Sequence, residues 1–242
     1  MREPVRRSFG PPEPIVSRVS LHSADLVILD DMQEEREQAL RDYKVTIEYK
    51  HLKSHAPGGV YVIPSLDDLR TFYGIIFVRR GVFANGIFKF VLRLPLLYND
   101  VDQHPRITFQ SEVYNPYIDE TTGELDIKTA YPNWDPSKHY LVTVLTFLKK
   151  IFYAKSFGDA QANMEARQLA EENMAVYRAK VDACVSKSQK DVYDNDPESV
   201  AKFTEEQLSH RVLRDLLKAN VKDPAQVSKT ALLSMISKAS NV

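Results

Sequence analysis

The sequence predicts an α+β fold: a four-stranded antiparallel meander with an N-terminal helix, C-terminal helices on one face, and extra helices beyond them. Two runs, 72–79 and 87–94, are rich in β-branched and aromatic residues and are joined by a short link with two glycines, which is typical of a hairpin. Apolar residues then recur at helical spacing over 141–152. A chain of 242 residues, 43% of them hydrophobic, is long enough for one well-packed domain with appendages.

The composition excludes several classes of protein. A net charge of −1 creates no overall field that would recruit nucleic acid or an anionic membrane. The single cysteine, Cys184, excludes a disulfide framework and suits a reducing compartment. Since Cys184 lies in a helical pattern, we expect a buried or half-exposed structural thiol. The six histidines show no metal-binding spacing, so we expect no metal and no other cofactor.

The sequence gives no sign of a membrane-spanning or secretory segment. No apolar run approaches the roughly 18–20 residues that a membrane span requires. The first 20 residues are rich in arginine and proline and do not resemble a secretory signal. We therefore expect a cytoplasmic protein without direct membrane insertion.

The chain divides into four predicted parts. Residues 1–29, with many prolines and arginines in the first 20, are expected to form a disordered arm. A folded domain follows over 30–185, then a polar linker over 186–203. Residues 204–242 hold two short amphipathic segments, beginning at Thr204 and Asp223, and form a helical extension. Because such short helices are not stable alone, they must pack on the domain or on a partner.

The predicted elements of the domain follow in order. Residues 30–52 open with acids and end with bases, as a helix dipole prefers, although alternation from Tyr43 to Tyr49 leaves a strand open there. The run 60–63 is interpreted as a connection into Pro64. Ile107–Tyr114 alternates as a third strand, and a short piece at Leu125–Ile127 supplies the fourth.

Two helices are predicted in the second half of the domain. Trp134-Asp-Pro-Ser137 has the composition of a helix start, with Ser or Asp as the cap and Pro in the first turn. The helical stripe of 141–152 follows it, and Trp134 itself is expected to anchor the core. A second helix is predicted over 159–185.

The stretch from the third strand to Trp134 resembles the active-site region of ubiquitin-conjugating enzymes. In that family a strand leads into His-Pro-Asn, a turn with glycine follows, and Gly-x-x-Cys supplies the nucleophile before a Trp-x-Pro. Here Asn115-Pro116-Tyr117 stands in place of His-Pro-Asn, and Gly123-Glu-Leu-Asp126 stands in place of Gly-x-x-Cys. Asp126 therefore occupies the nucleophile's position. The resemblance also favours a helix over 30–52.

These replacements predict a protein without conjugating activity. Ubiquitin transfer needs a thiolate, because a thioester forms easily and is easily broken by an amine. The Asp126 carboxylate cannot carry such an exchangeable bond. The missing asparagine removes an amide donor, and one such donor is worth about 3 kcal/mol. We therefore expect a pseudoenzyme with no catalytic residues, whose vestigial site is Asn115, Pro116, Tyr117 and Asp126.

Several runs resemble the fused-toes subfamily of inactive ubiquitin-conjugating variants, the group of crossbronx and the Akt-interacting protein. They are Gly59–Ser65, Phe72–Arg79, Gly86–Phe90 and Gly123–Lys128. This resemblance implies an adaptor that joins Hook-family coiled-coil proteins and a third scaffold subunit, and that links vesicles to microtubule motors. The alternative is a ubiquitin-pathway variant that binds ubiquitin or an active conjugating enzyme without forming a thioester.

Overall fold

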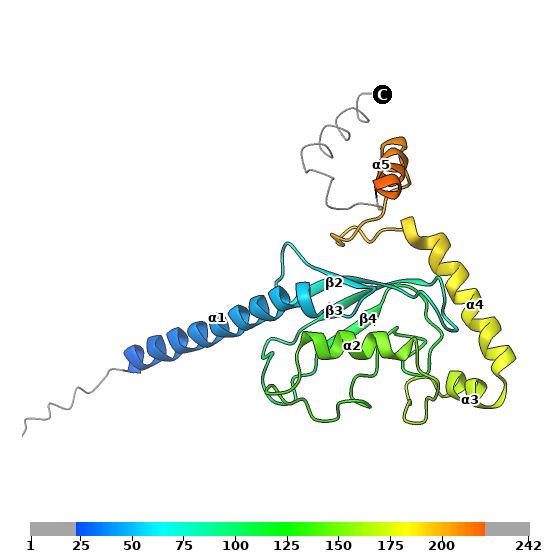
Figure 1. Cartoon of the computed structure of the whole chain (residues 1–242). Coiled ribbons are helices and arrows are strands. Elements are labelled where there is room, and N and C mark those ends of the chain that lie inside the picture. Colours follow the sequence, from blue (N-terminus) through cyan, green and yellow to red (C-terminus); the bar gives the residue numbers. More distant parts are fainter. Residues whose placement is uncertain (1–22, 221–242) are drawn as a thin grey trace, which may run out of the picture.

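The computed structural model describes residues 23–220. Most of the predicted arm 1–29 and the amphipathic segment that begins at Asp223 lie outside the described residues. The described part begins with the long helix α1, continues into a sheet covered on one face by α2, and ends with three further α-helices and a short 3₁₀ helix (Figure 1).

The sheet has four antiparallel strands in the order β1-β2-β3-β4, which confirms the predicted meander. Their bounds are Val60–Pro64, Thr71–Phe77, Ile87–Arg93 and Arg106–Phe109. In the β2–β3 hairpin, Gly74 lies opposite Phe90. A Cβ atom on Gly74 would come within 2.2 Å of the Phe90 ring, so the missing side chain makes room for that ring in the core.

Two predicted strands are wrong in their bounds. The fourth strand of the sheet is β1, in the run interpreted as a connection. The predicted piece near Leu125 forms isolated bridges instead, from Glu124 to Thr108 of β4 and from Leu125 to Ile118. Leu125 and Ile127 are nevertheless buried, since they belong to the core. The third strand ends at Phe109 instead of Tyr114, because the N–H groups of Gln110 and Ser111 both turn to the carbonyl oxygen of Lys89.

Helix α1, Ser23–His55, confirms the helical interpretation of 30–52 and begins inside the predicted arm. Its last three turns hold it to the domain. Val45 and Leu52 are buried in the core, and the Tyr49 ring lies 5.7 Å from that of Phe72. Glu48 accepts a hydrogen bond from the Tyr98 hydroxyl at 2.9 Å.

Helix α2, Leu141–Ile151, presents a buried apolar stripe to the sheet. The predicted start at Trp134 is wrong. Asp135 caps a local turn instead, since its carboxylate accepts hydrogen bonds from the N–H and the hydroxyl of Ser137. Trp134 is fully buried and donates its indole N–H to Asn99 at 2.6 Å, so its role as a core anchor is confirmed.

The predicted helix over 159–185 is two helices, α3 at Met164–Glu172 and α4 at Met174–Lys190. Asn173 separates them. Its backbone N–H donates to Leu169 at the end of α3, while its side chain accepts from the Val176 N–H at the start of α4. One asparagine thus ends one helix and caps the next.

The predicted linker 186–203 contains the last turn of α4 and the short helix η1, Asp191–Tyr193, before α5 at Leu208–Asn220. Residues 194–203, called the strap here, lie against the face of the sheet that points away from α2. The Phe203 ring meets that of Phe77 edge-on at 6.2 Å, and Lys89 donates to the Asp194 carbonyl oxygen at 2.6 Å. The division of the chain into parts remains a prediction.

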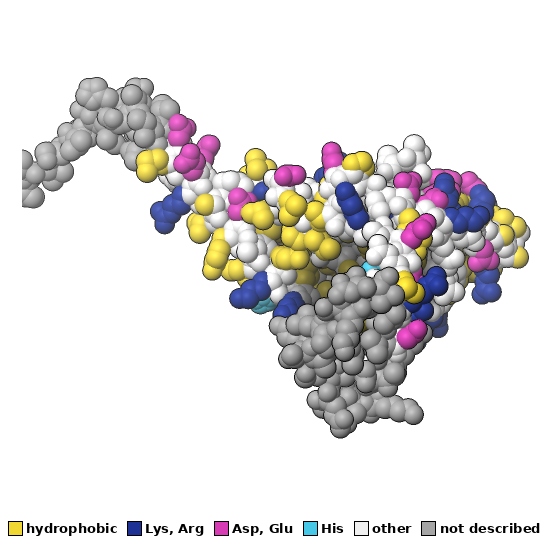
Figure 2. All heavy atoms as spheres, turned by 90° about the horizontal axis from the view of Figure 1, so that it is seen from above, with side chains coloured by type: hydrophobic (Ala, Val, Ile, Leu, Met, Phe, Trp, Pro, Cys, Tyr) yellow, Lys and Arg dark blue, Asp and Glu magenta, His cyan; other side chains and the backbone are white. Residues whose placement is uncertain are grey.

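Hydrophobic side chains also remain at the surface. They gather where α1 meets the sheet, on the side shown in Figure 2. The exposed ones of this region belong to α1, to β1 and to the β1–β2 connection: Leu40, Tyr43, Ile47, Tyr61, Ile63, Leu66 and Leu69.

Candidate functional site

The structure brings the two halves of the predicted vestigial site together. The backbone N–H of Asp126 donates to the carbonyl oxygen of Tyr117 at 2.9 Å, and the N–H of Asn163 donates to that of Pro116 at 3.0 Å. The segment Asn115-Pro116-Tyr117 is therefore held between the strand-like stretch at Asp126 and the start of α3. The correspondence of these residues to a catalytic centre remains a prediction.

Asn115 has a structural role in this arrangement. Its side chain is fully buried, donates to the carbonyl oxygen of Ile151 at 3.1 Å and accepts from the Tyr117 N–H at 3.0 Å. It thereby supplies a hydrogen-bond donor to a carbonyl oxygen at the end of α2 and stabilises the turn at Pro116. Because the side chain is fully buried and both ends of its amide bind partners inside the fold, Asn115 is not accessible to a substrate at the surface.

Asp126 is likewise engaged in local hydrogen bonds. Its carboxylate accepts from the N–H of Thr129 at 3.1 Å and from the Thr129 hydroxyl. This pattern closes the turn after Ile127. Thr129 was not predicted to take part, although an Asp followed by Thr three residues later is a common signal of such a turn.

The turn between the two halves is tightly built. Asp119 accepts from the N–H groups of Thr121 and Thr122, which lowers the pKa of its carboxyl. Gly123 has a φ of +69°, and its carbonyl oxygen accepts from the Phe109 N–H at 2.8 Å. This turn therefore connects the end of β4 to the Asp126 segment.

A surface cavity of about 510 Å³ opens beside Tyr117. The Tyr117 ring packs edge-on against Phe147 of α2 at 5.6 Å, and desolvation raises the pKa of its hydroxyl. Cys184 lies elsewhere, on α4, where it is buried as expected and where burial raises the pKa of its thiol. A buried thiol of raised pKa is a poor nucleophile.

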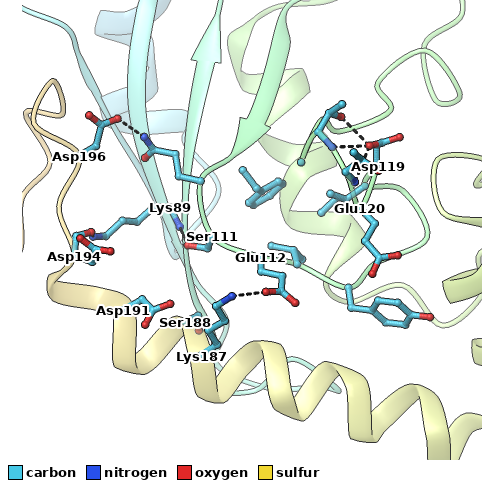
Figure 3. Close-up of a pocket in the computed structure, with 18 of the residues that line it drawn as sticks. Lys89, Ser111, Glu112, Asp119, Glu120, Lys187, Ser188, Asp191, Asp194 and Asp196 are labelled. Carbon is cyan, nitrogen blue, oxygen red and sulfur yellow. Dashed lines mark hydrogen bonds and ion pairs between the residues drawn. The ribbon is translucent and has the colours of Figure 1, made fainter.

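A larger cleft of about 610 Å³ was not predicted (Figure 3). It lies between the end of β4, the turn at Asp119 and the end of α4. Two side-chain contacts cross its lining: Lys187 forms an ion pair with Glu112 at 2.5 Å, and the Gln110 amide donates to the Asp196 carboxylate at 2.5 Å. These residues are far apart in the sequence and share no motif, so no sequence signal indicated the cleft.

The described residues contain no group of three or more His, Cys, Asp or Glu side chains that is arranged to hold a metal ion. Within the same part of the chain, no helix combines the length and the apolar character needed to cross a membrane.

Comparison with known proteins identifies the family. Residues 44–185 match the model of the family described as "Ubiquitin-conjugating enzyme". A protein crossbronx homolog of Culex quinquefasciatus is 35% identical over 162 residues, which cover 65% of this chain and 70% of that protein.

Two further relatives are longer than this chain. A protein AKTIP homolog of Nematostella vectensis is 33% identical over 68% of the chain and 55% of its own length. The AKT-interacting protein of Rattus norvegicus is 34% identical over 58% of the chain, and the match spans 47% of the rat protein. Together with the antiparallel sheet and its flanking helices, these matches show that the chain belongs to the ubiquitin-conjugating enzyme family and, within it, to the group of crossbronx and the AKT-interacting protein.

Proposed function

We propose that this protein is a non-catalytic adaptor that uses an inactive ubiquitin-conjugating fold to hold other proteins together. The observation that carries the proposal is the hydrogen bonding of the Asp126 carboxylate. It stands where the resemblance places the nucleophile, and its carboxylate is bound to Thr129. Asn115 supports the same conclusion, since its amide is used within the fold.

A charging assay tests the absence of catalysis. The full chain is incubated with ubiquitin-activating enzyme, ATP and ubiquitin, and an active conjugating enzyme serves as the positive control. We expect no adduct that a reducing agent removes. A reducible adduct on Cys184 would overturn the proposal, because Cys184 is the only cysteine of the chain.

The proposed partners are a Hook-family coiled-coil protein and a third scaffold subunit, in cytoplasmic transport of vesicles or endosomes along microtubules. Support comes from the crossbronx and AKT-interacting group to which the chain belongs. Co-purification with a Hook C-terminal segment at micromolar concentration is the expected result, and lack of association would contradict it. AKT is a further candidate in the same experiment, because some relatives are named for an interaction with it.

A second candidate function is non-covalent binding of ubiquitin or of an active conjugating enzyme, which the family membership favours. Titration of isotope-labelled ubiquitin, followed by NMR, separates the two functions. The adaptor proposal predicts no shift of ubiquitin resonances. Saturable shifts would favour the second function instead.

A further inference from the structure

Helix α1 has two opposite faces. Val45 and Leu52 point into the domain, and only 2% and 6% of their surface is exposed. A helix turns by about 100° per residue, so Met32, Leu40, Tyr43 and Ile47 share a stripe on the opposite side. Their exposed fractions are 61%, 54%, 63% and 39%. The stripe is therefore solvent-facing, directed away from the domain and largely apolar, with Arg36 as its charged member between Met32 and Leu40.

The N-terminal half of α1 extends well beyond the sheet (Figure 1). Residues 31–37 are exposed without exception. Helices gain most of their stability from packing an apolar face, and an unpacked helix of this length is marginal in water. The stripe from Met32 to Ile47 covers 15 steps along the helix, or about 22 Å. A second helix laid along it would supply the missing contacts.

The charges of α1 select the direction of that second helix. Residues 31–42 carry five acidic side chains and two arginines, whereas residues 43–55 carry three lysines and one glutamate. A parallel copy of α1 would place like charges together. An antiparallel copy places the acidic half against the basic half, which favours association and fixes its direction.

We propose that two copies of this chain associate through an antiparallel pair of α1 helices. Leu40 lies near the two-fold axis, and Met32 of each copy packs beside Ile47 of the other. Glu37 lies on the same flank of the stripe as Lys44, so Glu37 of one copy faces Lys44 of the other. Glu37 also lies 3.6 Å from Arg41 within the helix and keeps half of its side chain exposed for this second contact.

Sedimentation velocity of the full chain between about 1 and 100 µM tests the proposal. We expect a concentration-dependent dimer. Leu40→Glu places two carboxylates at the axis and should weaken the dimer at least tenfold, while the circular dichroism spectrum stays unchanged because Leu40 is exposed. Met164→Glu is the matched control. Met164 is 58% exposed but lies on α3, away from α1, so dimerisation should be unaffected.

A charge exchange tests the direction of pairing. Glu37→Lys and Lys44→Glu should each weaken the dimer, and the two substitutions together should restore it. A monomer at 100 µM, a dimer insensitive to Leu40→Glu, or no recovery in the double variant would overturn the proposal. A monomer whose α1 stripe binds a helix of another protein would also overturn it, because the stripe would then serve that protein and not a second copy of this chain. None of these outcomes depends on the charging assay or on binding to Hook.

Discussion

The N–H of Asp126 donates to the carbonyl oxygen of Tyr117 at 2.9 Å, across the eight residues between them. This bond joins the segments 115–117 and 123–126, which were predicted from the sequence to form a vestigial catalytic centre. Around it, the side chains of Asn115 and Asp126 each bind partners within the fold. Asn115 and Asp126, which are predicted to replace catalytic residues, therefore act as structural supports, and their removal should cost stability.

Asn115→Ala should be strongly destabilising. It leaves the buried Ile151 carbonyl and the Tyr117 N–H without partners, at a cost of about 3 kcal/mol. Urea unfolding measures the loss. Asn115→Asp is the matched variant of equal size: it keeps the acceptor for Tyr117 but sets a carboxylate against the Ile151 oxygen. Its defect should lessen at low pH, where the protonated acid can donate. A defect independent of pH would contradict this account.

Gly123→Ala should also destabilise the fold. A φ of +69° strains any residue with a Cβ atom, and that atom would lie 2.6 Å from the Phe109 carbonyl oxygen. We expect a loss of about 2 kcal/mol. Gly158→Ala is the control, since a Cβ atom there meets nothing within 4 Å. Equal melting temperatures for the two variants would show that the turn is not constrained.

Glu48 should give the stability a measurable dependence on pH. Burial raises the pKa of its carboxyl above the ordinary 4.5, although Tyr98 and the Leu141 N–H both donate to it. A raised pKa in the folded state means that ionisation costs more there than in the unfolded chain. The contribution of Glu48 to the free energy of unfolding is therefore fully present below pH 4.5. It is lost as the pH rises through the raised pKa of the folded state.

Glu48→Gln isolates this effect, because an amide oxygen can accept the same two hydrogen bonds but does not ionise. The free energy of unfolding of wild type, measured against that of the variant, should fall as the pH rises above about 4.5. A constant difference between pH 4 and pH 8 would contradict the assignment.

Lys89→Met should loosen the strap. Lys89 is largely buried, donates to Asp194 and to the Asn195 side chain, and lies 5.7 Å from the centre of the Phe203 ring. Methionine keeps the apolar stem and removes the donor. Hydrogen exchange over residues 194–203 should accelerate at least tenfold. Lys187→Met, which removes only a surface ion pair with Glu112, should leave these rates unchanged.

The sequence predicted the β2–β3 hairpin and the apolar stripe of α2 correctly, because in both the buried side chains follow the local hydrophobic pattern. The β2–β3 hairpin was predictable from β-branched and aromatic runs around an Asn-Gly pair, and Asn85 does adopt a positive φ of 69°. The stripe of α2 was predictable for the same reason. Motif spacing predicted that the segment ending at Tyr117 lies near Asp126, and the two are joined by a backbone hydrogen bond.

Errors arose where two local preferences compete. Asp135 and Ser137 have the composition of a helix cap but bind each other in a separate turn, which delays α2 to Leu141. Asn173 lies in a continuous helical pattern and still interrupts it. The strap and the large cleft depend on contacts between residues about 80–105 positions apart, such as Lys89 with Asp194, and no local pattern encodes such contacts.

The strap lies outside the portion shared with conjugating enzymes, which ends at residue 185. A shortened protein that stops there would uncover the face that carries Tyr73, Ile75 and Val91. Bare apolar area of this kind adheres to unrelated molecules. Screens for binding partners that use only the shared portion would therefore collect false positives, and the intact chain is the proper bait.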